Sequence, residues 1–425
     1  MREYLKKLPQ EIQDLIYLAR ETAVRRKVSA YLVGGFVRDL VLGVKNFDLD
    51  IVVEADGIKF AEEFAQELGA KLIRHRRFGT ATVISKPHLK IDIATARKEF
   101  YPEPAHLPVV ESGTLRDDLF RRDFTVNAMA IGIADHSFGQ LLDFFEGMSD
   151  LRKKRICVMH KLSFIDDPTR ILRAVRFEQR YNFRIAAETL KFLNEAVGLK
   201  MLEKVEPQRI RDDLILILKE DIPVKEIRRI ERLSGFSFLS PKLKLSGASY
   251  RLLQAIHKEV LWFKAKHAQR RHLDAWLIYM IGLFDRLQAP VIKDICRRFA
   301  FKRGEEKRIL DCKAMKKSLI SELCKEGIRP SRVWALLEPL SYEAVIFIKA
   351  KYQNRNLKKH VEDFLEIYNG TRIHISGDDL HKLGINPGPY YQKIFKNILN
   401  AKLDGLVKTK DEELTLVKKI LKRHR

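Results

Sequence analysis

Two aspartates one residue apart in an apolar segment are the first residues of this sequence that could carry chemistry. Asp48 and Asp50 lie within Phe47–Val53, which is predicted to form a β-strand. Because side chains alternate between the faces of a strand, both carboxylates should point the same way. Such a pair repels itself unless a cation lies nearby, and Mg²⁺ prefers carboxylate oxygens together with phosphate oxygens. The spacing indicates a magnesium site, although D-x-D pairs also occur as plain surface charges.

A third carboxylate comes from Asp92, which alternates with apolar residues in a predicted strand over residues 89–95. This pattern places it on a strand face, where it could complete a catalytic set with Asp48 and Asp50, or it could be an edge charge. Metal ions held by such carboxylates activate an attacking hydroxyl and stabilise a leaving pyrophosphate.

A glycine turn precedes the aspartate pair. The strand Ala30–Val33 is expected to end at Gly34-Gly35, and a helix should follow over Phe36–Leu42. Gly35 would let the backbone approach a phosphate closely, and the helix N-terminus attracts anions. Arg38 adds a cation in the first helical turn. The two glycines could also be a simple tight turn, but a glycine turn followed by D-x-D is typical of a nucleoside triphosphate site.

A second charged constellation lies further along the chain. Asp167 precedes Pro168, which fits an N-cap followed by the first position of a helix. At about 100° per residue, Asp166, Asp167, Arg170 and Arg173 fall within an arc of roughly 120°. A carboxylate can accept from the exocyclic amine of cytosine or adenine, while arginine donates to a ring nitrogen or carbonyl. This face could therefore select a base, although capping alone would explain Asp167.

Three segments resemble the signature motifs of the class II tRNA nucleotidyltransferase and bacterial poly(A) polymerase family, in the family's order. They are Leu32–Asp39 with the following Asp48-x-Asp50, then Arg121–Ala130, then Asp166–Phe177. The resemblance covers roughly residues 30–180. It implies an α+β fold, in which a small mixed α/β nucleotidyltransferase head is followed by an all-helical neck, body and tail.

The resemblance also implies roles for individual residues. The catalytic carboxylates are Asp48, Asp50 and Asp92, of which Asp48 and Asp50 hold Mg²⁺. The residues that contact the nucleotide are Gly35, Arg38, Arg122, Asp167, Arg170, Arg173 and Arg176. Within this set Gly35 and Arg38 line the triphosphate, and Asp167 and Arg170 read the base. One departure is Asp166, because the family often has glutamate there, which reaches further.

The pattern of the chain changes after about residue 150. The first part mixes strand and helix signals, with a proline-rich loop at 101–112, whereas from about 164 the periodicity is almost only helical, with few strand signals. The expected division is a catalytic head (1–150), a neck with the base-selecting motif (151–220), a body (221–350) and a tail that binds tRNA (351–425). In the family, a flexible loop near residues 98–115 helps to switch from C to A addition. Its sequence here resembles a form shared by members with different products.

The composition indicates a polyanionic partner. The chain carries 80 Lys+Arg against 56 Asp+Glu, a formal net charge of +24, and such basic proteins usually bind nucleic acid. No apolar run is long enough to span a membrane, and the four cysteines form no metal or disulfide pattern, so a reduced, cytoplasmic protein is expected. Candidate basic pairs, each also explained by a solvated helix face, are Arg270-Arg271, Arg297-Arg298, Lys302-Arg303, Lys316-Lys317, Lys358-Lys359 and Lys418-Lys419.

The sequence thus predicts addition of C and A to the 3′ acceptor end of tRNA from CTP and ATP, either as synthesis or as repair of the CCA end. The alternatives are a partial adder (CC only or A only), a poly(A) polymerase, a small-molecule nucleotidyltransferase and a non-catalytic RNA-binding module. The long basic helical half argues against a small-molecule enzyme. The intact Asp48 and Asp50 argue against loss of catalysis. No oligomeric state is indicated.

Overall fold

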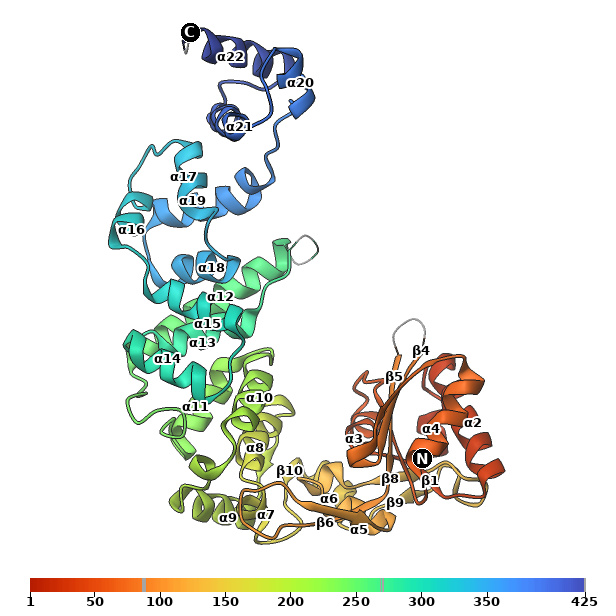
Figure 1. The fold of residues 1–425 in the computed structure, drawn as a ribbon. Helices are drawn as coiled ribbons and strands as arrows, with labels where there is room; N and C mark the ends of the chain where they lie inside the picture. The colour runs from red at the N-terminus through yellow and green to blue at the C-terminus, as the bar shows by residue number, and fades with distance from the viewer. Residues whose placement is uncertain (86–88, 268, 270, 424–425) are drawn as a thin grey trace. The chain divides into compact units, whose positions relative to one another are not determined.

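The structure, a computed structural model, describes residues 1–425 except 86–88, 268, 270 and 424–425 (Figure 1). It contains two compact units. The first comprises Met1–Glu220 and Lys225–Leu239, and the second comprises Asp221–Val224 and Ser240–Arg425. The predicted order of a mixed α/β head followed by helices is confirmed.

A seven-stranded sheet, ordered β3-β4-β5-β2-β1-β8-β9, forms the head. β2 and β5 are parallel to each other, whereas the other neighbouring strands are antiparallel. Helix α4 (Gly57–Leu68) buries Phe60 and Phe64 and packs against β4 and β5, and α2 (Gln10–Arg26) packs against α4. The strand bounds are β1 Ala30–Val33, β2 Leu49–Val53, β3 Lys71–His75, β4 Thr80–Ser85, β5 Leu89–Thr95, β8 Ala130–Gly132 and β9 Leu141–Leu142.

The predicted glycine turn is present between β1 and helix α3 (Gly35–Leu42), which ends at a left-handed Gly43 with φ +68°. The strand predicted over Phe47–Val53 is wrong at its start, because β2 begins at Leu49 and leaves Asp48 outside it. The physical reason is local: the Asp48 N–H donates to the side chain of Asn46 at 3.2 Å, which holds the preceding residues in a turn.

The loop predicted at 101–112 is also partly wrong. Val109–Ser112 forms β7, which pairs antiparallel with β6 (Arg97–Phe100). β-branched Val109 and Val110 favour this extended conformation despite the nearby prolines.

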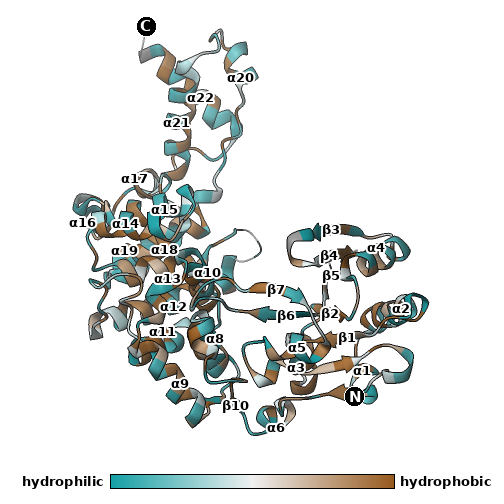
Figure 2. Ribbon diagram, turned by 60° about the horizontal axis from the view of Figure 1, so that its bottom comes forward, coloured by the Kyte–Doolittle hydropathy of each residue, from teal (hydrophilic) through white to brown (hydrophobic). Residues whose placement is uncertain are grey.

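Short helices connect the sheet to the rest of the first unit. Helix α5 (Leu115–Phe120) and the 3₁₀ turn η2 (Thr125–Asn127) precede β8 in the chain, and α6 (Gly147–Arg152) follows β9. The two-residue strands β10 (Arg155–Ile156) and β11 (Arg184–Ile185) pair in parallel. The helices that follow are α7 Ser163–Asp166, α8 Thr169–Arg180, α9 Ala187–Gly198, α10 Pro207–Leu218 and α11 Pro223–Leu233. Many of these helices carry one hydrophobic and one hydrophilic face, as expected where one face is buried (Figure 2).

In its described residues, the second unit is built of helices. Helices α12, α13 and α18 pack against one another. Residues 276–284 of α13 are all buried, so this apolar segment is a core helix. The bounds are α12 Gly247–His267, α13 Ala275–Phe284, α14 Ala289–Arg298, α15 Arg303–Lys313, α16 Lys317–Leu323, α17 Pro330–Leu337, α18 Tyr342–Lys351, α19 Arg355–Glu366, α20 Gly377–Lys382, α21 Pro389–Leu403 and α22 Lys410–Arg423.

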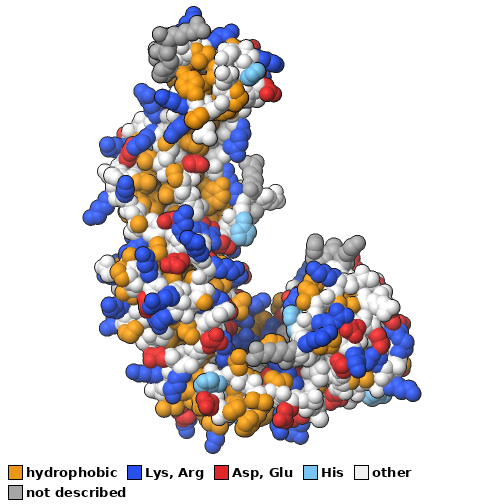
Figure 3. Space-filling view, in the orientation of Figure 1, with side chains coloured by type: hydrophobic (Ala, Val, Ile, Leu, Met, Phe, Trp, Pro, Cys, Tyr) orange, Lys and Arg blue, Asp and Glu red, His pale blue; other side chains and the backbone are white. Residues whose placement is uncertain are grey.

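Basic side chains are spread along the visible face of this helical unit (Figure 3). Among the predicted basic pairs, Arg297 and Arg298 both form ion pairs with Asp294, and Arg270 lies outside the described residues. A search of the described helices finds none that is long and apolar enough to cross a membrane.

Candidate active site

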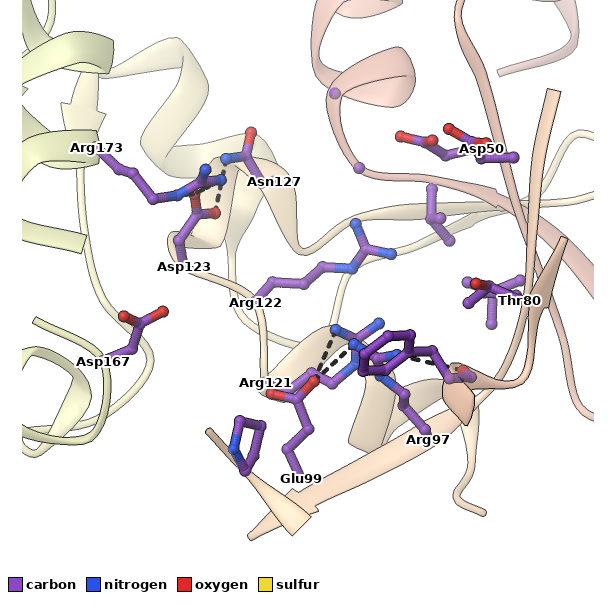
Figure 4. A pocket seen from close by; sticks show the side chains of 18 of the residues that line it. Asp50, Thr80, Arg97, Glu99, Arg121, Arg122, Asp123, Asn127, Asp167 and Arg173 are labelled. Carbon is purple, nitrogen blue, oxygen red and sulfur yellow. Dashed lines mark hydrogen bonds and ion pairs between the residues drawn. The ribbon is translucent and has the colours of Figure 1, made fainter. Parts of the chain in front are cut away.

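A cavity of about 980 Å³ lies within the first unit. It is lined by residues from the sheet, the β6–β7 hairpin, η2, α8 and α10. The predicted site residues that line it are Gly35, Arg38, Asp50, Asp92, Arg122, Asp167, Arg170, Arg173 and Arg176, whereas Asp48 does not. In Figure 4, Asp50 lies on one side of the cavity, Asp167 and Arg173 lie on the other, and Arg122 extends between them.

Two carboxylates meet on neighbouring parallel strands. Asp50 of β2 and Asp92 of β5 are register partners, and both line the cavity. Burial raises the pKa of Asp50 to about 6; Arg122 opposes this shift, and the negative charges of Asp92 and Asp48 add to it. Asp92 accepts hydrogen bonds from the Thr82 hydroxyl at 2.6 Å and from the Lys90 ammonium at 2.5 Å. Negative charge is thus concentrated at this end of the cavity.

This carboxylate pair has the donor chemistry that a hard divalent cation requires. Mg²⁺ is commonly held by one or two carboxylates, with phosphate oxygens and water completing its shell. The raised pKa of Asp50 means that its charge is costly without a nearby cation. Asp48 is exposed, and within the described ranges no three His, Cys, Asp or Glu side chains converge on one point. The residues therefore fit a metal that is bound together with a phosphate substrate.

The glycine turn brings its backbone close to these carboxylates. Gly34 has φ +71° and ψ −137°, a conformation that L side chains rarely adopt. A Cβ atom at Gly34 would lie 2.6 Å from Arg122 Nη1 and 3.3 Å from Asp50 Oδ2. The absence of a side chain here keeps the space between Arg122 and Asp50 open.

Arg38 lines the same cavity and forms a buried ion pair with Asp39. Its guanidinium donates twice to Asp39, at 2.8 and 2.9 Å, and once to the Asn127 side chain at 2.5 Å. It also lies 4.6 Å from the ring centroid of Tyr181. The positive charge of Arg38 that was predicted for the first helical turn is therefore partly neutralised by Asp39. Asn127 links Arg38 to Asp123, because it accepts a hydrogen bond from Arg38 and donates one to Asp123.

The base-selecting segment is not one continuous helix, contrary to the predicted arc. Asp166 ends α7, Asp167 is extended with φ −131° and ψ 91°, and α8 begins at Thr169 with Pro168 at the N-cap position. Asp167 lies outside both helices because a residue that precedes proline disfavours helical backbone. Its Oδ1 atom accepts from the Thr169 N–H at 3.2 Å, as the predicted N-cap role requires, so the arc was wrong but the capping residue was not. Asp167 still lines the cavity, where it accepts from the Thr169 hydroxyl at 2.7 Å.

Asp123 holds Arg173 of α8 in place, a role that was not predicted from the sequence. Its Oδ2 atom accepts two bonds from Arg173, at 2.9 and 2.6 Å, and its Oδ1 atom accepts from Asn127 at 2.8 Å. Burial alone would raise the pKa of Asp123, but Arg173 and Asn127 outweigh it and hold the pKa at about 2. The only sequence signal was its place between two arginines and Phe124, which also fits an ordinary turn.

The remaining two arginines are positioned by burial and charge. Arg170 is buried and donates to the Ser163 hydroxyl at 2.6 Å and to the Arg121 carbonyl at 2.7 Å. Burial and the nearby Arg173 lower the pKa of Arg176, whose Nε lies 3.9 Å from Glu220. Several cations thus face the carboxylates of the sheet across the cavity, an arrangement suited to a polyanion with an attached base.

Replacing Gly34 with alanine should disrupt this geometry. We expect Gly34→Ala to cost about 1–3 kcal/mol of unfolding free energy, from backbone strain, and to weaken nucleoside triphosphate binding because Arg122 must move. Gly43→Ala is the matched control, since Gly43 also has a positive φ but a Cβ there meets nothing within 4 Å. Urea unfolding and calorimetric ATP binding measure both effects. Equal losses of binding in the two variants would show that the close approach at Gly34 is unimportant.

Comparison with known proteins identifies the family of the chain. Residues 30–157 match the family model described as the poly A polymerase head domain. An A-adding tRNA nucleotidyltransferase of Geobacter sulfurreducens is 36% identical over 92% of this chain, which spans 45% of that relative's length. An A-adding tRNA nucleotidyltransferase of Halalkalibacterium halodurans is 31% identical, with 93% of this chain and 89% of the relative covered.

Relatives with other product names also match. A CC-adding tRNA nucleotidyltransferase of Deinococcus radiodurans and a CCA-adding enzyme of Lactococcus lactis are each 27% identical to this chain. The alignments cover 89% and 98% of those relatives, respectively.

Solved structures match over the full chain. The apo form II structure of a CCA-adding enzyme is 35% identical, with a TM-score of 0.79 and coverage of 98% of this chain and 97% of the other. The Thermotoga maritima CCA-adding enzyme in complex with tRNA is 33% identical, with a TM-score of 0.75 and coverage of 99% and 98%. Two further matches are CCA-adding enzyme complexes with ATP and with CTP. With a 31% identical relative covered over nearly its whole length, this chain belongs to the tRNA nucleotidyltransferase family.

Proposed function

We propose that this protein adds nucleotides from CTP and ATP to the 3′ end of tRNA to complete the CCA terminus. The observation that carries this proposal is a single cavity with paired strand carboxylates at one end and Asp167 beside Arg170 at the other. The first group suits the chemistry of a triphosphate, and the second suits recognition of a base. A template strand is not needed, because protein side chains select the base.

In this proposal the tRNA 3′-hydroxyl attacks the α-phosphate of the nucleotide. The new bond joins the 3′-oxygen to the α-phosphorus, the bond to the bridging oxygen breaks, and pyrophosphate leaves with that electron pair. Asp48 and Asp50 would hold Mg²⁺, which when bound neutralises charge on the phosphates and lowers the pKa of the hydroxyl. Asp92 orients the hydroxyl and accepts its proton. Arg122, close to Gly34 and Asp50, clamps the triphosphate.

The nucleotide's base would lie at the other end of the cavity. Asp167 accepts from the exocyclic amine of cytosine or adenine, and Arg170 donates to the neighbouring ring nitrogen or carbonyl. Guanine and uracil place a carbonyl where the amine should be, so the half-buried carboxylate of Asp167 would face an acceptor. Gly35, Arg38, Arg173 and Arg176 complete the nucleotide site, with Arg173 held in place by Asp123.

The tRNA partner is supported by charge and by the matched structures. The chain is strongly basic, and positive charge binds phosphates regardless of their sequence. A matched CCA-adding enzyme of similar length is solved in complex with tRNA. The helical second unit supplies surface for the acceptor and TΨC arms, and duplex RNA of this kind is recognised mainly by its shape.

Addition of the terminal A is the step that the relatives favour most. Both A-adding and CCA-adding enzymes perform it, and the two A-adding relatives are 36% and 31% identical to this chain. Full CCA addition is the second candidate, because a CCA-adding enzyme of 35% identity matches the whole chain in structure. CC addition alone is less favoured at 27% identity.

Three tRNA transcripts test the proposal, ending at the discriminator base, at C and at CC. Each is incubated with the protein, Mg²⁺ and single or mixed nucleotides. One A on the CC-ended transcript, followed by arrest, supports the proposal. Addition of CCA to the discriminator-ended transcript would extend it to full synthesis. Long A tails on unrelated RNA would indicate a poly(A) polymerase, and no addition to any transcript would contradict nucleotidyl transfer to tRNA.

A further inference from the structure

Asp167 is held through one of its two carboxylate oxygens. Its Oδ1 atom accepts hydrogen bonds from Arg209 Nη2 at 2.7 Å, from the Thr169 hydroxyl at 2.7 Å and from the Thr169 N–H at 3.2 Å. Within the part of the chain that the structure describes, the Oδ2 atom accepts none. The carboxylate lines the cavity on the side opposite Asp50 (Figure 4). One oxygen is therefore fixed, while the other remains available to a ligand.

The cation that pairs with the Asp167 carboxylate is Arg209, which lies on a different helix. Arg209 lies in the first turn of α10, 42 residues after Asp167, and its side chain also lines the cavity. The neighbouring arginines are engaged elsewhere: Arg173 pairs with Asp123, and Arg170 donates to Ser163 and to a backbone carbonyl. By contrast, in the described structure the side-chain hydrogen bond of Arg209 goes to Asp167 alone.

We infer that Arg209 is a positioning residue for base selection, which locks the orientation of Asp167 so that its second oxygen faces the base. This inference rests on the proposed function. A fixed acceptor needs no reorganisation when the correct base arrives. A carboxylate that is free to rotate could turn away from the carbonyl of guanine or uracil and admit the wrong nucleotide. Arg209 therefore acts on the choice of base through Asp167, without contacting the reacting phosphate.

The test compares nucleotide discrimination in Arg209→Gln, Arg209→Lys and the wild-type protein. Single-turnover incorporation into CC-ended tRNA is measured with ATP and with GTP. We expect the ATP-to-GTP ratio of kcat/KM to fall about 10- to 100-fold in Arg209→Gln, the range of one good base contact. Inhibition by pyrophosphate should be unchanged, because the triphosphate end is intact. Arg209→Lys keeps the charge and should restore part of the ratio.

Two further variants separate positioning from a merely structural role. Gln208→Ala changes an exposed neighbour in the same helical turn and should keep the wild-type ratio. Thr169→Val removes the other side-chain donor to Oδ1 without changing charge, and should lower the ratio in the same direction. Thr169→Val also keeps the inference testable if Arg209→Gln does not fold.

Two results would overturn the inference. One is a folded Arg209→Gln protein that discriminates as well as wild type. The other is an equal loss of rate with ATP and with GTP, because a structural role would reduce both alike. The wild-type control separates these results from a failure of the proposed function, because in that case the wild-type protein itself would add no nucleotide to tRNA.

Discussion

Asp50→Asn should abolish nucleotide addition while leaving the protein folded. The substitution keeps the shape of the side chain but removes the charge that the proposed metal requires, so we expect a loss of at least ~10³-fold in kcat, or about 4 kcal/mol of barrier. Because burial already raises the pKa of Asp50 to about 6, a neutral residue there should not destabilise the fold at neutral pH. Single-turnover incorporation and thermal unfolding measure the two effects.

Two further variants provide a control for Asp50→Asn and a test of Asp48. Asp14→Asn changes an exposed carboxylate on α2 of the same unit and should leave the rate unchanged. Asp48→Asn tests the second proposed metal-holding carboxylate, which is exposed and does not line the cavity. A loss of kcat in Asp48→Asn as large as that in Asp50→Asn would support the role of Asp48 in holding the metal. Normal activity in Asp48→Asn would assign the metal to Asp50 and Asp92, and normal activity in Asp50→Asn would refute the metal site altogether.

Asp123→Ala should be the most destabilising single substitution near the cavity. It removes the acceptor for two bonds from Arg173 and one from Asn127, and it leaves the half-buried Arg173 guanidinium with only the more distant Asp213 carboxylate, 3.9 Å away. Breaking a fully buried pair costs about 3–5 kcal/mol, and because Arg173 is partly exposed we expect a loss at the lower end of this range. Urea unfolding at neutral pH measures the loss for the first unit.

The loss of unfolding free energy in Asp123→Ala should depend on pH in a definite direction. The pKa of Asp123 is lowered from 3.8 to about 2 in the folded protein, so its stabilising contribution is present above pH 3.8 and disappears as the pH falls toward 2. The difference between wild type and Asp123→Ala should therefore shrink over this interval.

A surface pair provides the matched contrast for Asp123. Asp135→Ala breaks the exposed pair with Arg20, whose side chains are 58% and 36% accessible, and it should cost about 0–1 kcal/mol. Similar losses in the two variants, or a loss for Asp123→Ala that does not change with pH, would show that the buried pair is not a major source of stability.

The head of this protein is predictable from sequence because its signals are local. The turn at Gly34 and the alternation around Asp50 and Asp92 depend on neighbouring residues, and the structure places β1, α3 and β5 within one residue of the predicted bounds. The errors were also local. Asn46 forms a turn that delays β2 until after Asp48, and Pro168 keeps Asp167 out of a helical conformation, so the predicted arc is split between α7 and α8.

The partners of the charged residues could not be predicted in the same way. Asp123 and Arg173 are 50 residues apart, and Asp167 and Arg209 are 42 residues apart. Neither pair leaves a periodic pattern in the sequence, because each is made by the packing of separate elements. The structure thus adds what spacing cannot supply: which arginines are held by carboxylates and which oxygen of Asp167 remains free.

The most direct test of protein-only base selection is single-turnover addition to defined tRNA ends with each of the four nucleotides supplied alone. On CC-ended tRNA we expect one A and essentially no G or U, in the absence of any template. If the enzyme also synthesises the preceding residues, the discriminator-ended transcript should accept C only. Comparable incorporation of all four nucleotides, or incorporation that requires a complementary strand, would contradict selection by Asp167 and Arg170.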